Sequence, residues 1–452
     1  MLAILANPVF ARLFSAQCIA LVGTGLLTVA LGLLAYDIAG TGAGAVLGTA
    51  FAIKMVAYVG LAPLANAAAD RLPRKAVLIG ADLIRAVVAL ALPFVDAVWQ
   101  IYLLIFVLQA ASATFTPTFQ ATIPDLFESE ADYTRALSLS RLAYDLENLL
   151  SPALAGVLLL VTGYHNLFLG TVVGFAGSAL MVASVALPLR KAATRTRSFA
   201  ERATRGLRIY MATPRLRGLL GLSMAAAATS AFVLVNTVVL VRAGFGGAET
   251  QVAVALACYG AGSMLAALVL PQLLDHMPDR PVMVTAGTAV TLWTVVLGLW
   301  TWLAGLPAWP VFLALWALGG FLYSAILTPS GRLLRRSARP EDRPALFTAQ
   351  FTLSHACWLI AYPVAGIGGE ALGMPATLLI LGAMGLAGAV LAHMTWPPHD
   401  PESLAHDHPD LAPGHPHLEA DGQGGHRHAF VIDDEHRRWP SPPRARRTAP
   451  ER

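Results

Sequence analysis

The sequence predicts an all-α integral membrane protein with twelve transmembrane helices in two similar halves of six. The first observation is composition: 13% of the 452 residues are charged and 56% are hydrophobic, which is about half the charge of a soluble globular domain. The second is length, because the apolar residues fall in blocks of about twenty, enough to cross ~30 Å of hydrocarbon as helices. The third is that three short motifs recur in the same order in both halves.

Two sets of six apolar blocks define the predicted spans. The first set, an N-terminal bundle within 1–189, has spans at 11–36, 43–65, 76–95, 99–121, 138–162 and 166–188. A basic linker, 190–217, follows. The second set, a C-terminal bundle within 218–396, has spans at 218–242, 250–274, 281–303, 308–330, 345–369 and 374–396. Helices suit these blocks because lipid requires every backbone hydrogen bond to be satisfied internally.

Cationic residues gather in the loops on one side of the predicted membrane. They include Arg71, Arg74 and Lys75 after the second span, nine Lys or Arg in 190–217, and Arg332, Arg335, Arg336, Arg339 and Arg343 after the tenth span. The positive-inside rule places these loops, and both termini with them, in the cytoplasm. The opening MLAILANPVF lacks the basic region and cleavage site of a signal peptide, so we expect a retained first span in a bacterial inner membrane.

Several other classes of protein are disfavoured. The net charge of +4 is spread over short loops rather than a basic domain, which argues against nucleic-acid binding. Cys18, Cys258 and Cys357 lie in apolar blocks without a CxxC pattern, so neither a disulfide framework nor a thiol metal site is expected. No Walker A pattern occurs, which indicates that a gradient supplies the energy. We expect no enzymatic activity, no cofactor and a monomer.

The two halves share three motifs. The matched pairs are Asp70–Lys75 with Asp275–Arg280, Thr116–Pro117 with Thr328–Pro329, and Pro152–Gly156 with Pro363–Gly366. Motifs that recur in one order indicate a parallel internal repeat, which is typical of many transporters.

Over roughly residues 5–396 the chain resembles the major facilitator superfamily. The family loop after span two reads Gly-x-x-x-Asp-Arg-x-Gly-Arg-Lys/Arg, and Asp70, Arg71, Arg74 and Lys75 match it. Asn66 and Pro73 replace its two glycines. The resemblance implies a gating loop in which Asp70 caps a helix of the other half, where an anion gains about 0.3 to 1 kcal/mol. Alternatively, the three cations serve membrane topology only.

Span five carries a polar stripe. Ser138, Arg141, Asp145 and Asn148 are spaced 3, 4 and 3 residues apart and share one helix face, with Glu147 beside it. A charge in the bilayer costs at least ~2.5 kcal/mol, so these residues should face the bundle interior or a cavity. A local Arg141–Asp145 ion pair with a structural role is the alternative. Further along, Pro152 and Gly156 resemble the kink of family exporters.

Two other charged sites stand out in the N-terminal half. Lys54 lies about ten residues from either end of span two, too deep to snorkel easily. We expect Asp145 or Glu147 as its partner, in a pair that couples protonation to helix rearrangement; alternatively, Lys54 only faces water in a central cavity. Asp82 and Arg85 share a face near the cytoplasmic end of span three and are predicted to form a gate-side ion pair.

The C-terminal half offers fewer charges. Its intramembrane polar residues are Asn236, Gln350 and His355. His355 would titrate near neutral pH, although an interhelical hydrogen bond is the commoner role of a lone histidine. A proton-coupling group is therefore expected in the N-terminal half.

The tail, residues 397–452, is rich in Pro, His, Asp and Gly and is predicted to be largely disordered. It holds three His-x-His pairs: His406 with His408, His415 with His417, and His426 with His428. Imidazole is a preferred ligand of Ni²⁺, Cu²⁺ and Zn²⁺, and similar His-rich ends occur in nickel-resistance permeases of the superfamily. The alternative is a soluble tail that binds no metal. Phe430, Val431, Ile432 and Trp439 are apolar enough to dock on the cytoplasmic face.

These features predict a proton-coupled secondary transporter that expels its solute by alternating access. Two substrate classes stay open. The tail favours a divalent metal such as nickel, which we place first. The largely apolar interior favours an organic or amphipathic compound such as a drug or a siderophore. A metal-sensing receptor comes third, because such a receptor would need a soluble output domain and the sequence shows none.

Overall fold

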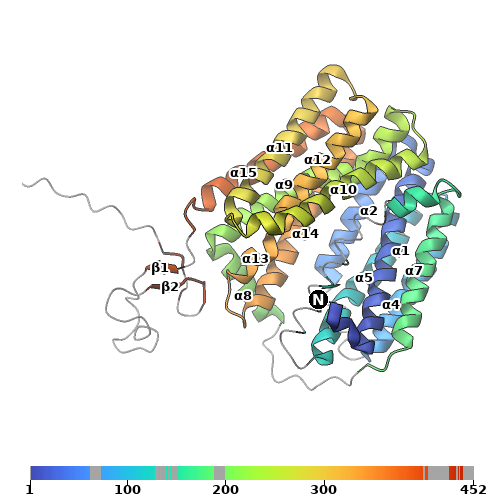
Figure 1. Cartoon of the computed structure of the whole chain (residues 1–452). Helices are drawn as coiled ribbons and strands as arrows, with labels where there is room; N and C mark the ends of the chain where they lie inside the picture. Colours follow the sequence, from blue (N-terminus) through green and yellow to red (C-terminus); the bar gives the residue numbers. More distant parts are fainter. Residues whose placement is uncertain are drawn as a thin grey trace, which may run out of the picture.

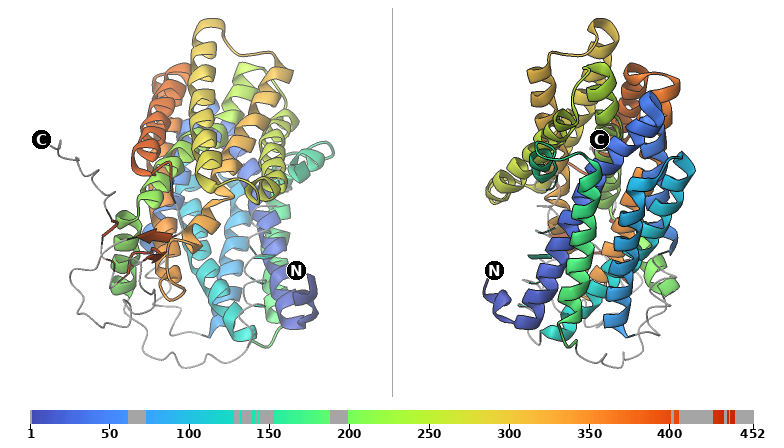
Figure 2. Two further views of the ribbon diagram at one scale, coloured as in Figure 1. Left: turned by 60° about the vertical axis from the view of Figure 1, so that its left-hand side comes forward. Right: turned by 90° about the vertical axis from the view of Figure 1, so that its right-hand side faces the viewer.

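The structure is a computed structural model. It describes residues 2–61, 73–127, 153–187, 199–400, 403–405, 427–433, 436 and 438–440, with single positions between 132 and 151. The described chain is mainly helical, and its long helices form two bundles that lie side by side (Figures 1 and 2).

The N-terminal bundle contains five long helices among the described residues. They are α1 (Pro8–Ala39), α2 (Ala43–Val56), α4 (Arg74–Ala91), α5 (Val98–Thr122) and α7 (His165–Ala183). Short 3-10 turns flank them at Leu2–Ala6, Gly40–Gly42, Leu92–Phe94 and Ile123–Leu126, and the π-turn η3 (Ala57–Leu61) extends α2. Asn7 fixes the start of α1, because its side chain accepts hydrogen bonds from the backbone of Val9 and Phe10.

The C-terminal bundle begins with an amphipathic helix and continues with six long ones. They are α8 (Phe199–Ala212), α9 (Pro214–Val239), α10 (Glu249–Leu274), α11 (Asp279–Ala304), α12 (Trp309–Leu327), α14 (Arg343–Ala371) and α15 (Met374–Thr395). The π-turn η6 (Leu240–Gly244) extends α9, and the short α13 (Ser330–Arg335) follows α12. In the tail, β1 (Ser403–Ala405) pairs antiparallel with β2 (Arg427–Ala429), with Leu404 opposite His428.

The predicted spans correspond closely to the helices. Within the described residues, ten helical stretches are long and apolar enough to cross a membrane. The first, Pro8–Gly60, holds the predicted spans 11–36 and 43–65, so eleven of the twelve predicted spans are accounted for. The remaining one, 138–162, is described only at isolated positions before residue 153, although residues 153–158 are helical. The helical membrane fold is therefore confirmed.

The internal repeat is visible in the packing of the two halves. In the N-terminal half the first and last spans, α1 and α7, cross at Gly23 and Gly174, where an added Cβ on Gly174 would lie 3.0 Å from the Cα of Gly23. In the C-terminal half the equivalent helices α9 and α15 cross at Gly221 and Gly388, and a Cβ on either would lie 2.2 Å from the other's carbonyl oxygen. Small residues allow this close approach between membrane helices.

The charged elements mark one end of the molecule. The N-terminus, α8, α13 and the tail hairpin all lie at the same end of the bundles (Figures 1 and 2). The helix sides are apolar, and Phe94, Leu303 and Met394 are at least 80% exposed. Such surfaces suit contact with lipid. We call the end with α8 and α13 the basic end and the other end the outer end.

Candidate functional site

The two bundles meet at the outer end along α2 and α14. A Cβ on Gly48 of α2 would lie 2.6 Å from the carbonyl oxygen of Tyr362, and one on Gly366 of α14 would lie 2.3 Å from that of Gly44. The helices therefore touch backbone to backbone, with no room for a side chain between them. We call Gly44, Gly48 and Gly366 the outer seal.

Asn236 adds a polar side chain to the outer seal. This residue of α9 is fully buried, and its Nδ2 donates a hydrogen bond to the carbonyl oxygen of Ala365 at 2.9 Å. Its Oδ1 would lie 2.6 Å from a Cβ on Gly44. Nearby, the guanidinium of Arg242 lies 5.5 Å from the centroid of the Tyr36 ring in the other half, within the range of a cation–π contact. Polar contacts therefore reinforce the glycine contact.

Between the outer seal and the basic end, the seam between the halves is lined by aromatic side chains. Phe51 of α2 lies 5.1 Å from Tyr362 of α14, and Tyr58 lies 5.8 Å from His355, measured between ring centroids. The ring contacts continue into the C-terminal half through Phe351, Trp358, Tyr323 and Tyr259. We call these eight residues the aromatic seam. Tyrosine and tryptophan offer a large apolar face with one polar atom, so the seam presents broad apolar surfaces and few directional groups.

Lys54 and His355 bring ionisable groups to the aromatic seam. The Nζ of Lys54 lies 5.6 Å from the centroid of the Tyr58 ring, and the same ring contacts His355. His355 Nδ1 lies 2.7 Å from the carbonyl oxygen of Phe351. The seam residues come from α2, its π-turn η3, α10, α12 and α14. π-turns are frequent at functional sites.

Most of the predicted span-five residues lie outside the described part of the chain. Arg141, Asp145, Glu147 and Asn148 are all in this group, so the expected pairing of Lys54 with Asp145 or Glu147 stays a prediction. The described Gly156 packs against α10, where an added Cβ would lie 3.4 Å from the Cβ of Ala253. This position of span five therefore contacts the opposite half.

Asp82 and Arg85 form an ion pair inside the N-terminal bundle. Their side chains are 0% and 6% exposed. The Arg85 guanidinium lies between two rings, 4.4 Å from the centroid of Phe115 on α5 and 4.5 Å from that of Phe175 on α7. The pair is thus enclosed by α4, α5 and α7, and its predicted part in the gate stays a prediction.

The predicted gating loop is described only at its end. Asp70 and Arg71 lie outside the described residues. Arg74 begins α4, and Lys75 donates a hydrogen bond from Nζ to the carbonyl oxygen of Ala183 at 2.6 Å. In the matching loop of the other half, Asp279 accepts hydrogen bonds at 2.5 and 2.8 Å from Arg332. This C-terminal loop is therefore held by an arginine of its own half.

The tail is partly folded against the C-terminal bundle. Phe430 and Ile432 are 3% and 1% exposed and belong to a buried cluster that includes Leu333 and Leu334 of α13. This burial agrees with the predicted docking of the segment, and the predicted disorder of the rest of the tail stays a prediction. Five predicted metal ligands, His406, His408, His415, His417 and His426, lie outside the described residues, and His428 stands in β2. Within the described chain, no cluster of three His, Cys, Asp or Glu side chains suits a metal.

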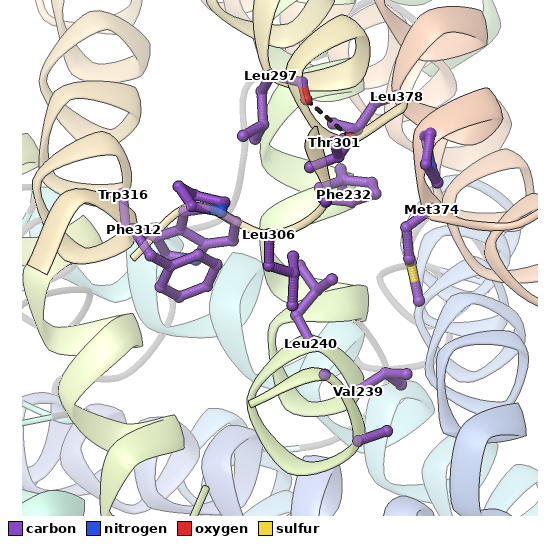
Figure 3. A pocket seen from close by; sticks show the side chains of 15 residues that line it. Phe232, Val239, Leu240, Leu297, Thr301, Leu306, Phe312, Trp316, Met374 and Leu378 are labelled. Carbon is purple, nitrogen blue, oxygen red and sulfur yellow. Dashed lines mark hydrogen bonds between the residues drawn. The ribbon is translucent and has the colours of Figure 1, made fainter. Parts of the chain in front are cut away.

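A separate cavity of about 330 Å³ lies inside the C-terminal bundle at the outer end (Figure 3). Phe232, Leu240, Leu297, Trp316 and Leu378 are among its lining residues. The Thr301 hydroxyl at its edge already donates to the carbonyl oxygen of Leu297. The cavity is apolar and away from the aromatic seam, so it offers no ionisable group for coupled transport.

Sequence reasoning missed most of the aromatic seam. Tyr58, Tyr259, Tyr323, Trp358 and Tyr362 lie in apolar blocks, where an aromatic residue reads as ordinary core. The assembly of five elements brings them together. The sequence pattern carried no signal for them, because even the π-turn beside Lys54 leaves no mark in the pattern of apolar residues.

Comparisons with known proteins agree with this architecture. The family model of the Major Facilitator Superfamily matches residues 13–246 and 218–422. Macrolide efflux protein A of Streptococcus pyogenes is 27% identical over 184 residues, which are 40% of this chain and 45% of that protein. The uncharacterized MFS-type transporter YfiS of Bacillus subtilis is 29% identical over 108 residues, 24% of this chain and 26% of YfiS. The chain thus spans less than half the length of these relatives.

Two solved structures share the fold. The nucleoside transporter NupG superposes with a TM-score of 0.63 at 15% identity, over 86% of this chain and 99% of NupG. A bacterial homolog of the human lysosomal transporter Spinster, in an inward-facing and unoccupied conformation, gives 0.64 at 13% identity, over 86% and 98% of the two chains. At these identities the likeness concerns the fold alone.

Proposed function

The chain belongs to the Major Facilitator Superfamily, and from that membership we propose that it exports an organic, amphipathic solute by alternating access. The observation that carries the proposal is the aromatic seam between the two halves. A solute with apolar and unsaturated parts gains from contact with rings such as Tyr58, Trp358 and Tyr362. A few polar atoms at the seam would orient it.

The direction of transport is supported by a relative. The matched region of macrolide efflux protein A covers 45% of that protein, whose name describes efflux. We therefore propose both the class of solute, an organic compound, and the direction of transport, export. A hydrated divalent metal prefers imidazole and carboxylate ligands, whereas the described seam contributes rings, one imidazole and one ammonium. This difference in chemistry favours the organic solute.

Orientation follows from the basic end. We place α8, α13 and both termini in the cytoplasm of a bacterial cell, with the protein in the inner membrane as a monomer. The support is the cluster of arginines at this end, including Arg332, Arg335 and Arg336 of the α13 region. The outer seal then faces away from the cytoplasm and must separate when the solute leaves.

Proton antiport is the proposed energy source. Lys54 lies at the seam on a helix that also forms the outer seal. In this proposal Lys54 binds in turn to the solute and to a carboxylate, which Asp145 or Glu147 supplies. The switch between these two partners would link proton binding to movement of α2. Neutral variants of these three residues should therefore lose proton-dependent transport while still folding.

A matched pair of tryptophan variants tests the seam. Trp358→Leu removes a ring at the aromatic seam. Trp302→Leu removes the ring of a tryptophan that is 62% exposed at the molecular surface. In vesicles energised with a proton gradient and assayed with a panel of organic compounds, Trp358→Leu should reduce export at least tenfold. Trp302→Leu should leave export unchanged. Equal transport by the two variants would show that the aromatic seam is not part of the transport path.

A second candidate substrate is a divalent metal such as nickel. The observation that favours it is the set of three His-x-His pairs in the tail. Growth across a series of metals, with and without the gene, tests it. Metal resistance that disappears when the six histidines become alanine would favour this candidate over the organic solute.

A further inference from the structure

A cluster of arginines on the basic end of the C-terminal half is covered by the protein's own tail. Arg215, at the start of α9, is 2% exposed. Its Nη1 lies 3.1 Å from Oδ1 of Asp400, and Nη2 of Arg336 lies 2.5 Å from Oδ2 of the same carboxylate. Trp396 Nε1 also donates to Oδ2, at 3.1 Å. One tail carboxylate is thus enclosed by two guanidinium groups and an indole N–H.

A second tail segment covers the adjoining surface. Asp433 Oδ2 lies 2.8 Å from Nη2 of Arg339. The guanidinium of Arg215 lies 5.1 Å from the centroid of the Trp439 ring, and Phe430 packs against the same ring at 5.0 Å. The pairing of β1 with β2 joins this segment to the one that holds Asp400. The two parts of the tail therefore bind as one unit.

The charge balance of this surface depends on the tail. Arg336 also approaches Asp279 of the bundle, with its Nε 3.6 Å from Oδ2, and Arg332 binds the same carboxylate. In the described structure four arginines, Arg215, Arg332, Arg336 and Arg339, bind one bundle carboxylate and two tail carboxylates, so the tail supplies two of the three negative charges. Departure of the tail leaves Arg215, Arg336 and Arg339 without their tail carboxylates, so another anion can take the place of these carboxylates.

We propose that Arg215, Arg336 and Arg339 form a phosphate-binding surface. The tail occupies this surface as an internal ligand, and anionic phospholipid headgroups compete with the tail for it. Guanidinium groups bind carboxylate and phosphate in the same forked geometry. The surface lies at the N-terminal ends of α9 and α11, where helix dipoles favour anions. Helix ends of membrane spans lie at headgroup depth, and anionic lipids attract clustered arginines there.

This arrangement makes the tail a sensor of the lipid beside it. In a neutral membrane Asp400 and Asp433 remain bound to the arginines. In a membrane rich in anionic lipid, headgroup phosphates take their place and the tail is released. Lipid binding at these arginines does not depend on the transported solute, so failure of lipid binding and failure of the proposed export are separate results.

Hydrogen exchange of the full chain in lipid nanodiscs tests the inference. Nanodiscs of phosphatidylcholine are compared with nanodiscs containing phosphatidylglycerol, and exchange is followed in peptides from 396–405 and 427–440. We expect exchange in both segments to rise at least fivefold in the anionic nanodiscs. In Asp400→Asn both segments should exchange rapidly in both lipids. Asp433→Asn removes the contact with Arg339 and should release the tail independently of Asp400.

The controls distinguish the sources of phosphate. Asp275→Asn makes the same charge change at an exposed residue of the basic end and should behave as the unmodified protein. Inorganic phosphate added to phosphatidylcholine nanodiscs should leave exchange unchanged. Equal exchange of the unmodified protein in the two lipids would overturn the inference, and release by inorganic phosphate alone would overturn the assignment to lipid.

Discussion

At the scale of single residues, glycines decide where the two halves can touch. Gly48 and Gly80 both lie inside helices, yet a Cβ on Gly48 would stand 2.6 Å from a backbone oxygen, whereas one on Gly80 would meet nothing within 4 Å. The sequence contains both glycines without distinguishing them. The difference comes from the neighbouring helix, which the local pattern of apolar residues does not specify.

Gly48→Ala should therefore impair transport, and Gly80→Ala should not. The methyl group at residue 48 forces α2 away from α14 and opens the outer seal. At residue 80 the same change replaces glycine in a helix and should stabilise the protein by about 0.5 to 1 kcal/mol. Export in vesicles and thermal unfolding measure the two effects. Full transport by Gly48→Ala would show that the seal does not need to close.

Asp433 predicts how the tail contact responds to pH. Burial opposes its ionisation, but the hydrogen bonds from His436 and the charge of Arg339 lower its pKa to about 2. Because the folded pKa is below the ordinary value of 3.8, its stabilising contribution is complete above that value and is lost as pH falls toward 2. In a His436→Gln variant, which removes the imidazole of this contact, the mobility of a spin label at Pro440→Cys should therefore stay constant from pH 5 to 8. A change within that range would contradict this assignment.

At the scale of elements, the spans could be predicted and their partners could not. The lengths of the apolar blocks located eleven helices, because crossing lipid fixes both length and composition. The basic stretch 190–217 gave no sign that its second part forms α8. That helix is held by tertiary contacts: Arg205 reaches both carboxylate oxygens of Asp342 at 2.5 and 2.8 Å, and the Tyr210 hydroxyl donates to Gln350 at 2.5 Å.

Loss of the Arg205 contact should detach α8. In Asp342→Asn the charge of the acceptor is removed from a pair whose side chains are 12% and 3% exposed. Hydrogen bonds to charged groups contribute about 1.5 to 3 kcal/mol, so amide exchange in α8 should rise at least tenfold. Arg335→Gln, at an exposed residue of α13, serves as the control. Unchanged protection of α8 in Asp342→Asn would show that packing alone holds it.

At the scale of the whole molecule, the proposed transport requires two halves that separate at one end and close at the other. The crossing of α1 with α7 and of α9 with α15 through paired glycines gives each half the same internal frame. The repeated motifs in the sequence anticipated this duplication. The aromatic seam arises only when the halves are placed together, which explains why its residues could not be singled out beforehand.

Alternating access requires the two halves to separate at the outer end, and this separation can be measured. Thr41 and Leu372 are exposed on opposite halves beside the outer seal, and spin labels at both positions report their separation in proteoliposomes. We predict one short distance in the resting protein and a second, longer population when an exported organic solute and a proton gradient are present. A single distance that ignores a solute under active export would contradict alternating access through this seam.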